Sequence, residues 1–167
     1  MILDTDYINY NITNNIDIPV PYRWTHGATD NNMGDGIVVY SLIHHMRAKN
    51  CVCIGSGGGY IPRIMTQARV DLHKQGIDDE KSFFRTHFFP RFIKETSENA
   101  FYNFFIPQDI KIDILFIDGD HTYEGVKKDF DLYSTILSTN GIIIIHDTDQ
   151  RYEDSLIVSE DAKKDYF

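Results

Sequence analysis

Residues 112–145 read IDILFIDGDHTYEGVKKDFDLYSTILSTNGIIII, and this stretch decides the fold. It opens on the nearly continuous apolar run 112–117 and closes on four isoleucines after Gly141. Such runs are typical of parallel strands that are covered on both faces. An apolar stripe at helical spacing lies between them and predicts a helix that Asn140-Gly141 ends; it consists of Val126, Phe130, Tyr133 and Leu137. Two parallel strands need such a crossover, so this order predicts a parallel sheet.

The same order of elements is predicted upstream. Cys51-Val52-Cys53-Ile54 indicates a short buried strand, and the glycine loop Gly55-Ser56-Gly57-Gly58-Gly59 follows it directly. A helix over residues 60–68 comes next, and another helix of about 12 residues starts at Gly36. Together these units predict an α/β fold: a Rossmann-like, doubly wound and mostly parallel sheet with helices on both faces.

The length of 167 residues suits one domain. Residues 1–35 are rich in Asn, Asp and Pro and show no sustained period, so we expect an irregular N-terminal arm before a single domain over 36–167. The segment 83–105 is rich in phenylalanine. Core packing is the expected role of these rings, and a substrate wall or a homodimer contact is the alternative.

Composition bears on partners and location. Sixteen Lys and Arg against 25 Asp and Glu give a net charge of −9 without a basic patch, which argues against a nucleic-acid partner. No apolar stretch approaches the roughly 18–20 residues that cross a bilayer, so we expect no membrane partner and a cytoplasmic location. The two cysteines, Cys51 and Cys53, lack zinc-site companions and are expected to be buried, inert thiols.

Ligands of open parallel sheets bind beyond the carboxyl ends of the strands. Polar or glycine clusters follow each expected strand, including a short one at Phe92-Ile93: residues 55–59, 95–99, 118–121 and 146–149. We therefore expect one site at this edge. The dinucleotide fingerprint would need glycine at Tyr60, which disfavours a nucleotide-dependent oxidoreductase.

At these residues the chain resembles the class I S-adenosylmethionine (SAM)-dependent methyltransferases. CVCIGSGGGY, residues 51–60, looks like their first motif. Residues 112–148 are similar to the fourth and fifth strands of a branch of small-molecule O-methyltransferases, which includes sugar and macrolide O-methyltransferases and cephalosporin-hydroxylase-like proteins. The resemblance covers about residues 33–149 and implies an enzyme that uses SAM.

The resemblance also implies roles for single residues. The loop residues Gly55, Ser56, Gly57 and Gly59 would bind the methionine part of SAM, Ser97 and Glu98 would lie near adenine, and Asp118 would lie near the methionyl group or a metal. Cys53 stands where the family usually has an acid. A ribose-binding carboxylate is expected about 20 residues after the loop. Asp78, Asp79 and Glu80 have that offset, but residues 70–77 are a poor strand, so either this strand is degenerate or residues are missing there.

The chemistry of methyl transfer points to further residues. Asp118 and Asp147 offer hard oxygens suited to Mg²⁺, whereas Thr148 replaces the Asn or Asp that often follows the second aspartate in metal-dependent relatives. His121 or His146 is the candidate general base, Asp118 being catalytic beside them. Helix capping by Asp120 and His121, and backbone bonding by His146, are the alternatives. Residues 24–27 and 33–36 form either a lid or a plain surface arm.

The predicted activity is methyl transfer from SAM to an oxygen, or as the less favoured acceptor a nitrogen, of a small molecule or sugar. The alternative is a SAM- or nucleotide-binding module without catalysis. Class I sheets usually have seven strands, whereas four can be placed here and 22 residues follow Ile145. The chain is therefore either an abbreviated fold or lacks segments.

Overall fold

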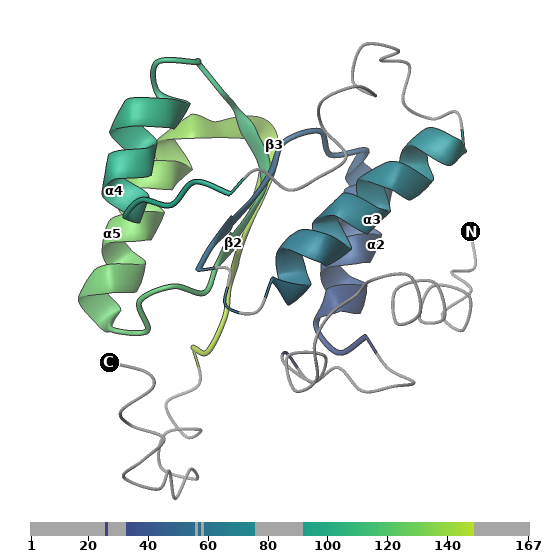
Figure 1. The fold of residues 1–167 in the computed structure, drawn as a ribbon, viewed down its shortest axis with the longest axis horizontal. Helices are drawn as coiled ribbons and strands as arrows, with labels where there is room; N and C mark the ends of the chain where they lie inside the picture. Colours follow the sequence, from purple (N-terminus) through teal and green to yellow (C-terminus); the bar gives the residue numbers. More distant parts are fainter. Residues whose placement is uncertain (1–25, 27–32, 56, 58, 76–91, 149–167) are drawn as a thin grey trace, which may run out of the picture.

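The computed structural model describes residues 26, 33–55, 57, 59–75 and 92–148 (Figure 1). Three strands form one parallel sheet in the order β1-β2-β3, with bounds β1 (Cys51–Ile54), β2 (Ile112–Ile117) and β3 (Leu137–Ile145). The helical elements are α2 (Gly36–Met46), α3 (Tyr60–Lys74), α4 (Ser97–Ala100), the π-helix η3 (Phe101–Phe105), α5 (Tyr123–Tyr133) and the 3₁₀ turn η4 (Ser134–Ile136).

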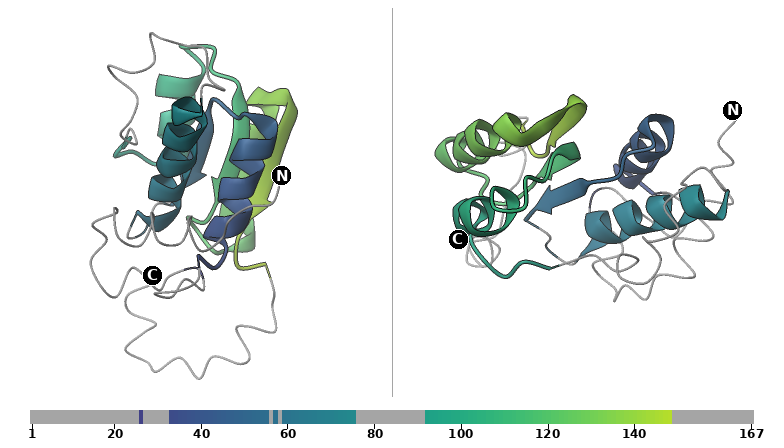
Figure 2. Two further views of the ribbon diagram at one scale, coloured as in Figure 1. Left: turned by 90° about the vertical axis from the view of Figure 1, so that its right-hand side faces the viewer. Right: turned by 90° about the horizontal axis from the view of Figure 1, so that it is seen from above.

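Helices cover both faces of the sheet, as the views in Figures 1 and 2 show. The side chains of β2 alternate between two cores: Ile114 and Phe116 pack with α2 and α3, whereas Leu115 and Ile117 pack with α4, η3 and α5. All four are at most 1% exposed, so the central strand is buried on both sides. The predicted α/β class with helices on both faces is confirmed.

The register brings the carboxyl ends of the three strands level. Ile54 pairs with Ile117, and Ile117 pairs with Ile145. The residues that follow these three, Gly55, Asp118 and His146, are therefore neighbours at one edge of the sheet. This edge carries the site described below.

The two helices before and after β1 follow the sequence pattern in part. The helix from Gly36 is confirmed, since α2 ends at Met46. The helix expected over 60–68 instead continues to Lys74, because the apolar stripe continues from Ala68 to Leu72, which is 1% exposed. Residues 70–74 are thus helical, and no strand starts there. The ribose-binding candidates at 78–80 lie outside the described residues.

The helix α5 differs from its prediction at the C-terminal end. It begins as expected after Thr122, whose hydroxyl accepts a hydrogen bond from the Gly125 N–H at 3.1 Å. It ends at Tyr133 and not at Asn140-Gly141, and Leu137 already pairs with Ile112 in the sheet. Pairing between strands outweighs the helical spacing of Leu137, so β3 is longer than the expected strand over 141–145.

The strand expected at Phe92-Ile93 is not formed, since residues 92–95 have no regular structure. The following segment instead forms α4 and η3, which bury Phe101 and Phe105 in the second core. The expectation of core packing is confirmed for these two rings, whereas Tyr102 is 55% exposed. Residues 83–89 and the strand-like segment 155–158 lie outside the described residues.

Cys51 and Cys53 are free thiols. Burial raises the pKa of each to about 12, so both stay protonated and are poor nucleophiles. Within the part of the chain that the structure describes, every helix is too short or too polar to cross a bilayer.

Candidate functional site at the carboxyl edge of the sheet

The glycine loop after β1 lies against the end of β2. Gly55 has φ +76°, and a Cβ atom at this position would lie 2.0 Å from the carbonyl oxygen of Asp118, so only glycine fits. Gly57 and Gly59 also have positive φ, and a Cβ on Gly57 would meet nothing within 4 Å. Gly59 then caps the N-terminus of α3. Backbone N–H groups at a helix N-terminus favour anions in general, and the role of this loop in binding the methionine part of SAM stays a prediction.

Further predictions from the sequence concern Ser56 in this loop and Cys53 at the end of β1. Ser56 and Gly58 lie outside the described residues, so the cofactor role expected for Ser56 stays a prediction. Cys53, which stands where the family usually has an acid, places its Sγ 3.4 Å from the Gly55 carbonyl oxygen, to which it is a weak donor.

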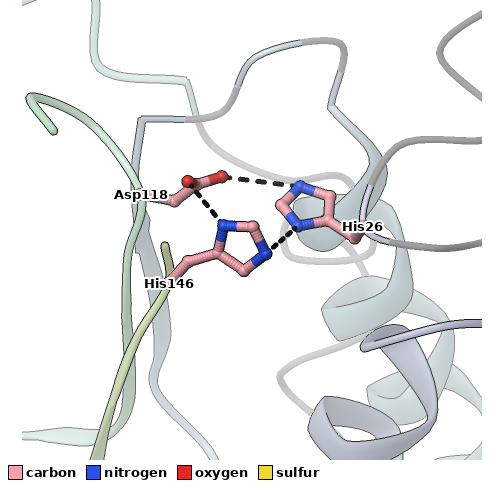
Figure 3. A group of neighbouring side chains, drawn as sticks. All are labelled: His26, Asp118 and His146. Atoms are coloured by element: carbon pink, nitrogen blue, oxygen red, sulfur yellow. Dashed lines mark hydrogen bonds and ion pairs between the residues drawn. The ribbon is translucent and has the colours of Figure 1, made fainter. Parts of the chain in front are cut away.

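Asp118, directly after β2, is the centre of the site (Figure 3). Its Oδ1 lies 3.2 Å from His146 Nδ1 and 3.7 Å from His121 Nε2, and its Oδ2 lies 3.5 Å from His26 Nε2. The side chain is only 15% exposed. Burial raises the pKa of this carboxyl group, although the three histidines oppose the shift.

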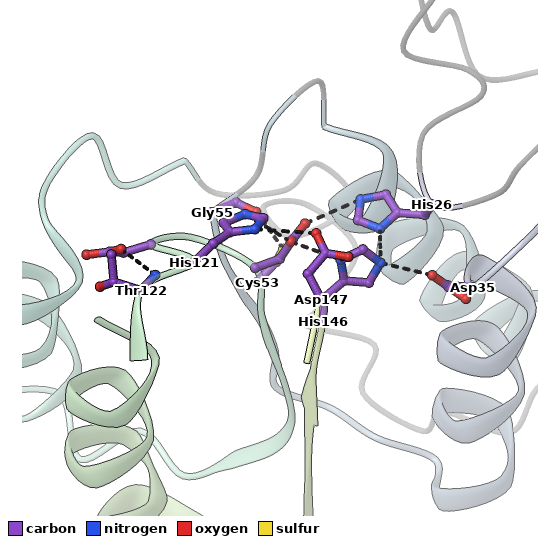
Figure 4. A network of polar contacts seen from close by, with 10 residues as sticks. His26, Asp35, Cys53, Gly55, His121, Thr122, His146 and Asp147 are labelled. Atoms are coloured by element: carbon purple, nitrogen blue, oxygen red, sulfur yellow. Dashed lines mark hydrogen bonds and ion pairs between the residues drawn. The ribbon is translucent and has the colours of Figure 1, made fainter. Parts of the chain in front are cut away.

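His146, directly after β3, contacts three carboxylates (Figure 4). Its Nε2 donates to Asp35 Oδ2 at 3.1 Å, because a carboxylate can only accept, and its Nδ1 lies 3.0 Å from Asp147 Oδ1. Burial lowers the pKa of His146, but Asp118, Asp147 and Asp35 outweigh it and hold the pKa above its ordinary value. The backbone N–H also donates to the Ile117 carbonyl at 3.0 Å, so the backbone bonding that the sequence suggested is present, and the role of general base stays a prediction.

His121 reaches the same centre from the start of α5. Its Nδ1 lies 3.3 Å from Asp147 Oδ2, and 45% of its side chain is exposed. The capping role falls to Asp120, whose Oδ1 accepts the Thr122 N–H at 2.9 Å, and to Thr122 itself. The imidazole of His121 is therefore available to the site.

His26 is a site residue that sequence reasoning did not identify. Besides its contact with Asp118, its ring lies 4.7 Å from that of His146 and 5.7 Å from that of Phe116, and it stacks on Tyr60 at 6.0 Å. Burial lowers its pKa, although Asp118 opposes the shift. The sequence offered only a lone histidine within a candidate lid, 120 residues from His146.

Ser97 and Glu98 are placed differently from the residues around Asp118. The Ser97 hydroxyl donates to the buried Asp129 at 2.5 Å, and Tyr133 Oη donates to the Ser97 carbonyl at 2.7 Å, so Ser97 ties α4 to α5. Glu98 is exposed in the first turn of α4. The role near adenine expected for Ser97 and Glu98 stays a prediction.

Two overlapping groups of side chains could hold a metal ion. In each group the ligand atoms lie within 4.8 Å of one another, and the groups are His26, Asp118 and His146, and Asp118, His121 and Asp147. Asp147 has φ +51°, a left-handed conformation that is strained for a non-glycine residue and recurs at functional sites. The predicted pair Asp118 and Asp147 is thus brought together, and histidines surround it.

Comparisons with known proteins agree with this arrangement. A family model described as a methyltransferase domain matches residues 37–148, well over half of the chain. A 36-residue stretch is 53% identical to an uncharacterized protein of Acanthamoeba polyphaga mimivirus and amounts to 22% of this chain and 16% of that protein. The chain thus matches less than a fifth of the relative's length. No solved structure matches it. Because the matched residues include the glycine loop, Asp118, His121, His146 and Asp147, the chain belongs to the class I SAM-dependent methyltransferase family.

Proposed function

We propose that the protein transfers the methyl group of SAM to an oxygen of a small molecule or sugar. The observation that carries this proposal is the strand register, which sets the bare glycine loop beside Asp118 and the histidines at one edge of the sheet. The loop would hold the donor, and the histidine and carboxylate cluster would face the acceptor.

The reaction is an in-line displacement at the methyl carbon. The acceptor oxygen forms the new C–O bond while the S–C bond breaks, and the electron pair of that bond stays on sulfur to give S-adenosylhomocysteine. The proton of the acceptor hydroxyl passes to a general base. The protein therefore aligns donor and acceptor and makes the oxygen nucleophilic.

His121 suits the role of base better than His146. Its side chain is 45% exposed, whereas His146 is 23% exposed, donates from Nε2 to Asp35 and has a buried Nδ1. A base must reach the acceptor proton directly or through one water molecule, which requires this accessibility. Asp147, 3.3 Å from His121 Nδ1, would stabilise the imidazolium that forms.

Asp118 and Asp147 would hold a divalent cation, for which two carboxylates alone predict Mg²⁺. Such an ion, when bound, lowers the pKa of a coordinated hydroxyl group. Thr148, which follows Asp147 in the chain, is exposed. Its hydroxyl is a poorer ligand than the Asn or Asp that often stands at this position in metal-dependent relatives. The convergence of donor atoms within 4.8 Å is the structural observation that supports a cation here.

The experiment has a binding arm and a transfer arm. S-adenosylhomocysteine at 100 times its Kd should stabilise the protein by about 2.7 kcal/mol in a thermal-shift assay. Transfer of a labelled methyl group is then measured over a panel of hydroxylated and amino acceptors. His121→Ala should lower kcat by about 10² to 10⁴-fold, whereas His45→Ala, an exposed position on α2, is the matched control.

The outcomes separate the rival functions. Binding without transfer to any acceptor favours a non-catalytic SAM-binding module. Methylation of amines alone favours a nitrogen acceptor. The absence of a thermal shift with S-adenosylhomocysteine overturns both the enzyme and the module.

A further inference from the structure

The described residues before α2 are held against the site by three hydrogen bonds. The Asp35 N–H donates to the His26 carbonyl at 2.9 Å, and the Asp35 carboxylate accepts from His146 Nε2 at 3.1 Å. Tyr60 Oη donates to the Met33 carbonyl at 2.7 Å, and Met33 is 1% exposed in the first core. His26 and Asp35 are therefore tied to the carboxyl edge of the sheet.

The ring of His26 is fixed in direction. It stacks on Tyr60, meets Phe116 edge to face, and its side chain is only 13% exposed. The backbone of His26 has φ +57°, a left-handed conformation that is strained for a residue other than glycine and recurs at functional sites. A side chain enclosed in this way keeps one orientation, so each of its two ring nitrogens has a defined partner.

These partners decide which nitrogen of the His26 ring carries the proton. His26 Nδ1 lies 3.3 Å from His146 Nε2, which donates to Asp35. Nδ1 of His26 thus faces a donor and has to accept. The ring proton is left for Nε2, which lies 3.5 Å from Asp118 Oδ2, an atom that can only accept. Figure 3 shows both contacts of the His26 ring.

We propose that His26 is the positioning residue of Asp118: its Nε2–H holds Oδ2, so that Oδ1 stays turned toward His146 and His121. Oδ1 lies 3.2 Å from His146 Nδ1 and 3.7 Å from His121 Nε2. The second separation is too long for a hydrogen bond, so Nε2 of His121 stays open to the proton of the acceptor hydroxyl. The inference rests on the proposed function, in which His121 is the general base.

The contact from His26 protects the space beside His121. Without it, Oδ2 of Asp118 loses this contact, and the carboxylate turns more readily to bring an oxygen against His121 Nε2, where the acceptor hydroxyl has to reach this nitrogen. Figure 4 shows His26 and His121 on opposite sides of His146. The His26 side chain is 13% exposed and that of His121 is 45% exposed, so His26 acts through Asp118 and the acceptor approaches from the side of His121.

Two variants of the full chain separate the Nε2 donor from the ring. His26→Phe keeps an aromatic ring for the stack on Tyr60 and removes both nitrogens, whereas His26→Gln offers an amide N–H near the ε position. In the labelled methyl transfer assay, His26→Phe should lower kcat by about tenfold, as expected for a lost hydrogen bond to a carboxylate, and keep the KM for SAM within about twofold. His26→Gln should restore kcat to within about threefold of wild type.

The controls check the fold and the donor site. His45→Phe makes the same exchange at an exposed position on α2 and should keep the wild-type kcat. Circular dichroism and calorimetry with S-adenosylhomocysteine should give equal results for all four proteins. The ¹⁵N chemical shifts of the His26 ring in the wild-type protein at neutral pH should place the proton on Nε2, and this measurement needs no acceptor.

Three results would overturn the inference: wild-type kcat in His26→Phe, an equal loss of kcat in His26→Phe and His26→Gln, or a ring proton on Nδ1 of His26. Absence of transfer by the wild-type protein contradicts the proposed function instead. In that case the ¹⁵N chemical shifts still test the contact between His26 and Asp118.

Discussion

Gly55 couples the glycine loop to the strand that carries Asp118. Its Cα approaches the end of β2 so closely that a methyl group would meet the Asp118 carbonyl carbon and oxygen and the Gly119 Cα, all within 2.4 Å. The loop backbone and Asp118 are therefore placed by one contact between main chains. The same contact explains why the loop starts with glycine whether or not a cofactor is bound.

Gly55→Ala should reduce the free energy of unfolding by more than about 3 kcal/mol, because it combines left-handed strain with a backbone clash. Gly57→Ala is the matched control, since its φ is also positive but its Cβ would meet open space. It should cost only about 1–2 kcal/mol. Urea unfolding of the two variants checks the difference, and equal destabilisation would show that the approach to Asp118 does not constrain Gly55.

Single residues differ in how far the sequence predicts their position. Asp118, His121, His146 and Asp147 lie within four residues of the end of an expected strand, so local apolar runs are enough to predict that they meet at one edge of the sheet. The contact of His26 with Asp118 joins residues 92 positions apart, and no local pattern predicts it.

At the scale of elements, Asp113 anchors the start of β1 to β2. Its Oδ2 accepts the backbone N–H groups of Lys49 and Asn50 at 2.8 and 3.0 Å. The Asn50 amide in turn donates to the Lys111 carbonyl at 2.8 Å. These bonds set the register with which β1 enters the sheet, and through it the position of Gly55.

Asp113→Ala should therefore lower the free energy of unfolding at pH 7 by about 1 kcal/mol, because it removes two solvent-exposed hydrogen bonds to a charged acceptor. Burial raises the pKa of Asp113, but the hydrogen bonds from Asn50, Ser138 and Lys49 outweigh burial and hold the pKa below its ordinary value. Its contribution is thus present above the ordinary aspartate pKa of about 4 and is lost as the pH falls through the lower folded value.

Urea unfolding of wild type and Asp113→Ala at several pH values between 7 and about 3 measures this dependence. The difference between the two proteins should be constant near neutral pH and shrink at the acidic end. A difference that grows on acidification would show that the pKa of Asp113 is raised in the folded state.

Element boundaries show how far local patterns can be used. The start of α5 at Thr122 was predictable, because a cap is formed by neighbours in sequence. Its end was not, since Leu137 continues the helical stripe and yet pairs with Ile112 in the sheet. In the same way, the short strand expected at Phe92-Ile93 is not formed, and residues 97–105 form α4 and η3, whose aromatic rings pack with side chains of β2.

At the scale of the whole molecule, the net charge favours some classes of partner over others. The chain carries a net charge of −9, and three carboxylates, Asp35, Asp118 and Asp147, surround the histidines of the site. A polyanion would be repelled both at long range and at the site. A small neutral acceptor would approach without this barrier.

We therefore expect no nucleic-acid binding. The fluorescence anisotropy of a labelled duplex or single strand should stay unchanged up to about 100 µM protein at physiological salt, beyond the range of ordinary non-specific complexes. Bovine serum albumin and a basic DNA-binding protein serve as negative and positive controls. Salt-sensitive binding in the micromolar range would contradict this expectation.

From the sequence alone one could predict the α/β class, the parallel sheet that contains β1, β2 and β3, and the strand ends that carry Asp118, His146 and Asp147. These features follow from apolar runs, glycines and caps, which act over a few residues. The tertiary structure was needed to show that β3 begins at Leu137, that no strand forms at Phe92-Ile93, and that His26 and Asp35 approach Asp118 and His146. Those outcomes depend on contacts between segments up to 120 residues apart, whose free energy no local pattern contains.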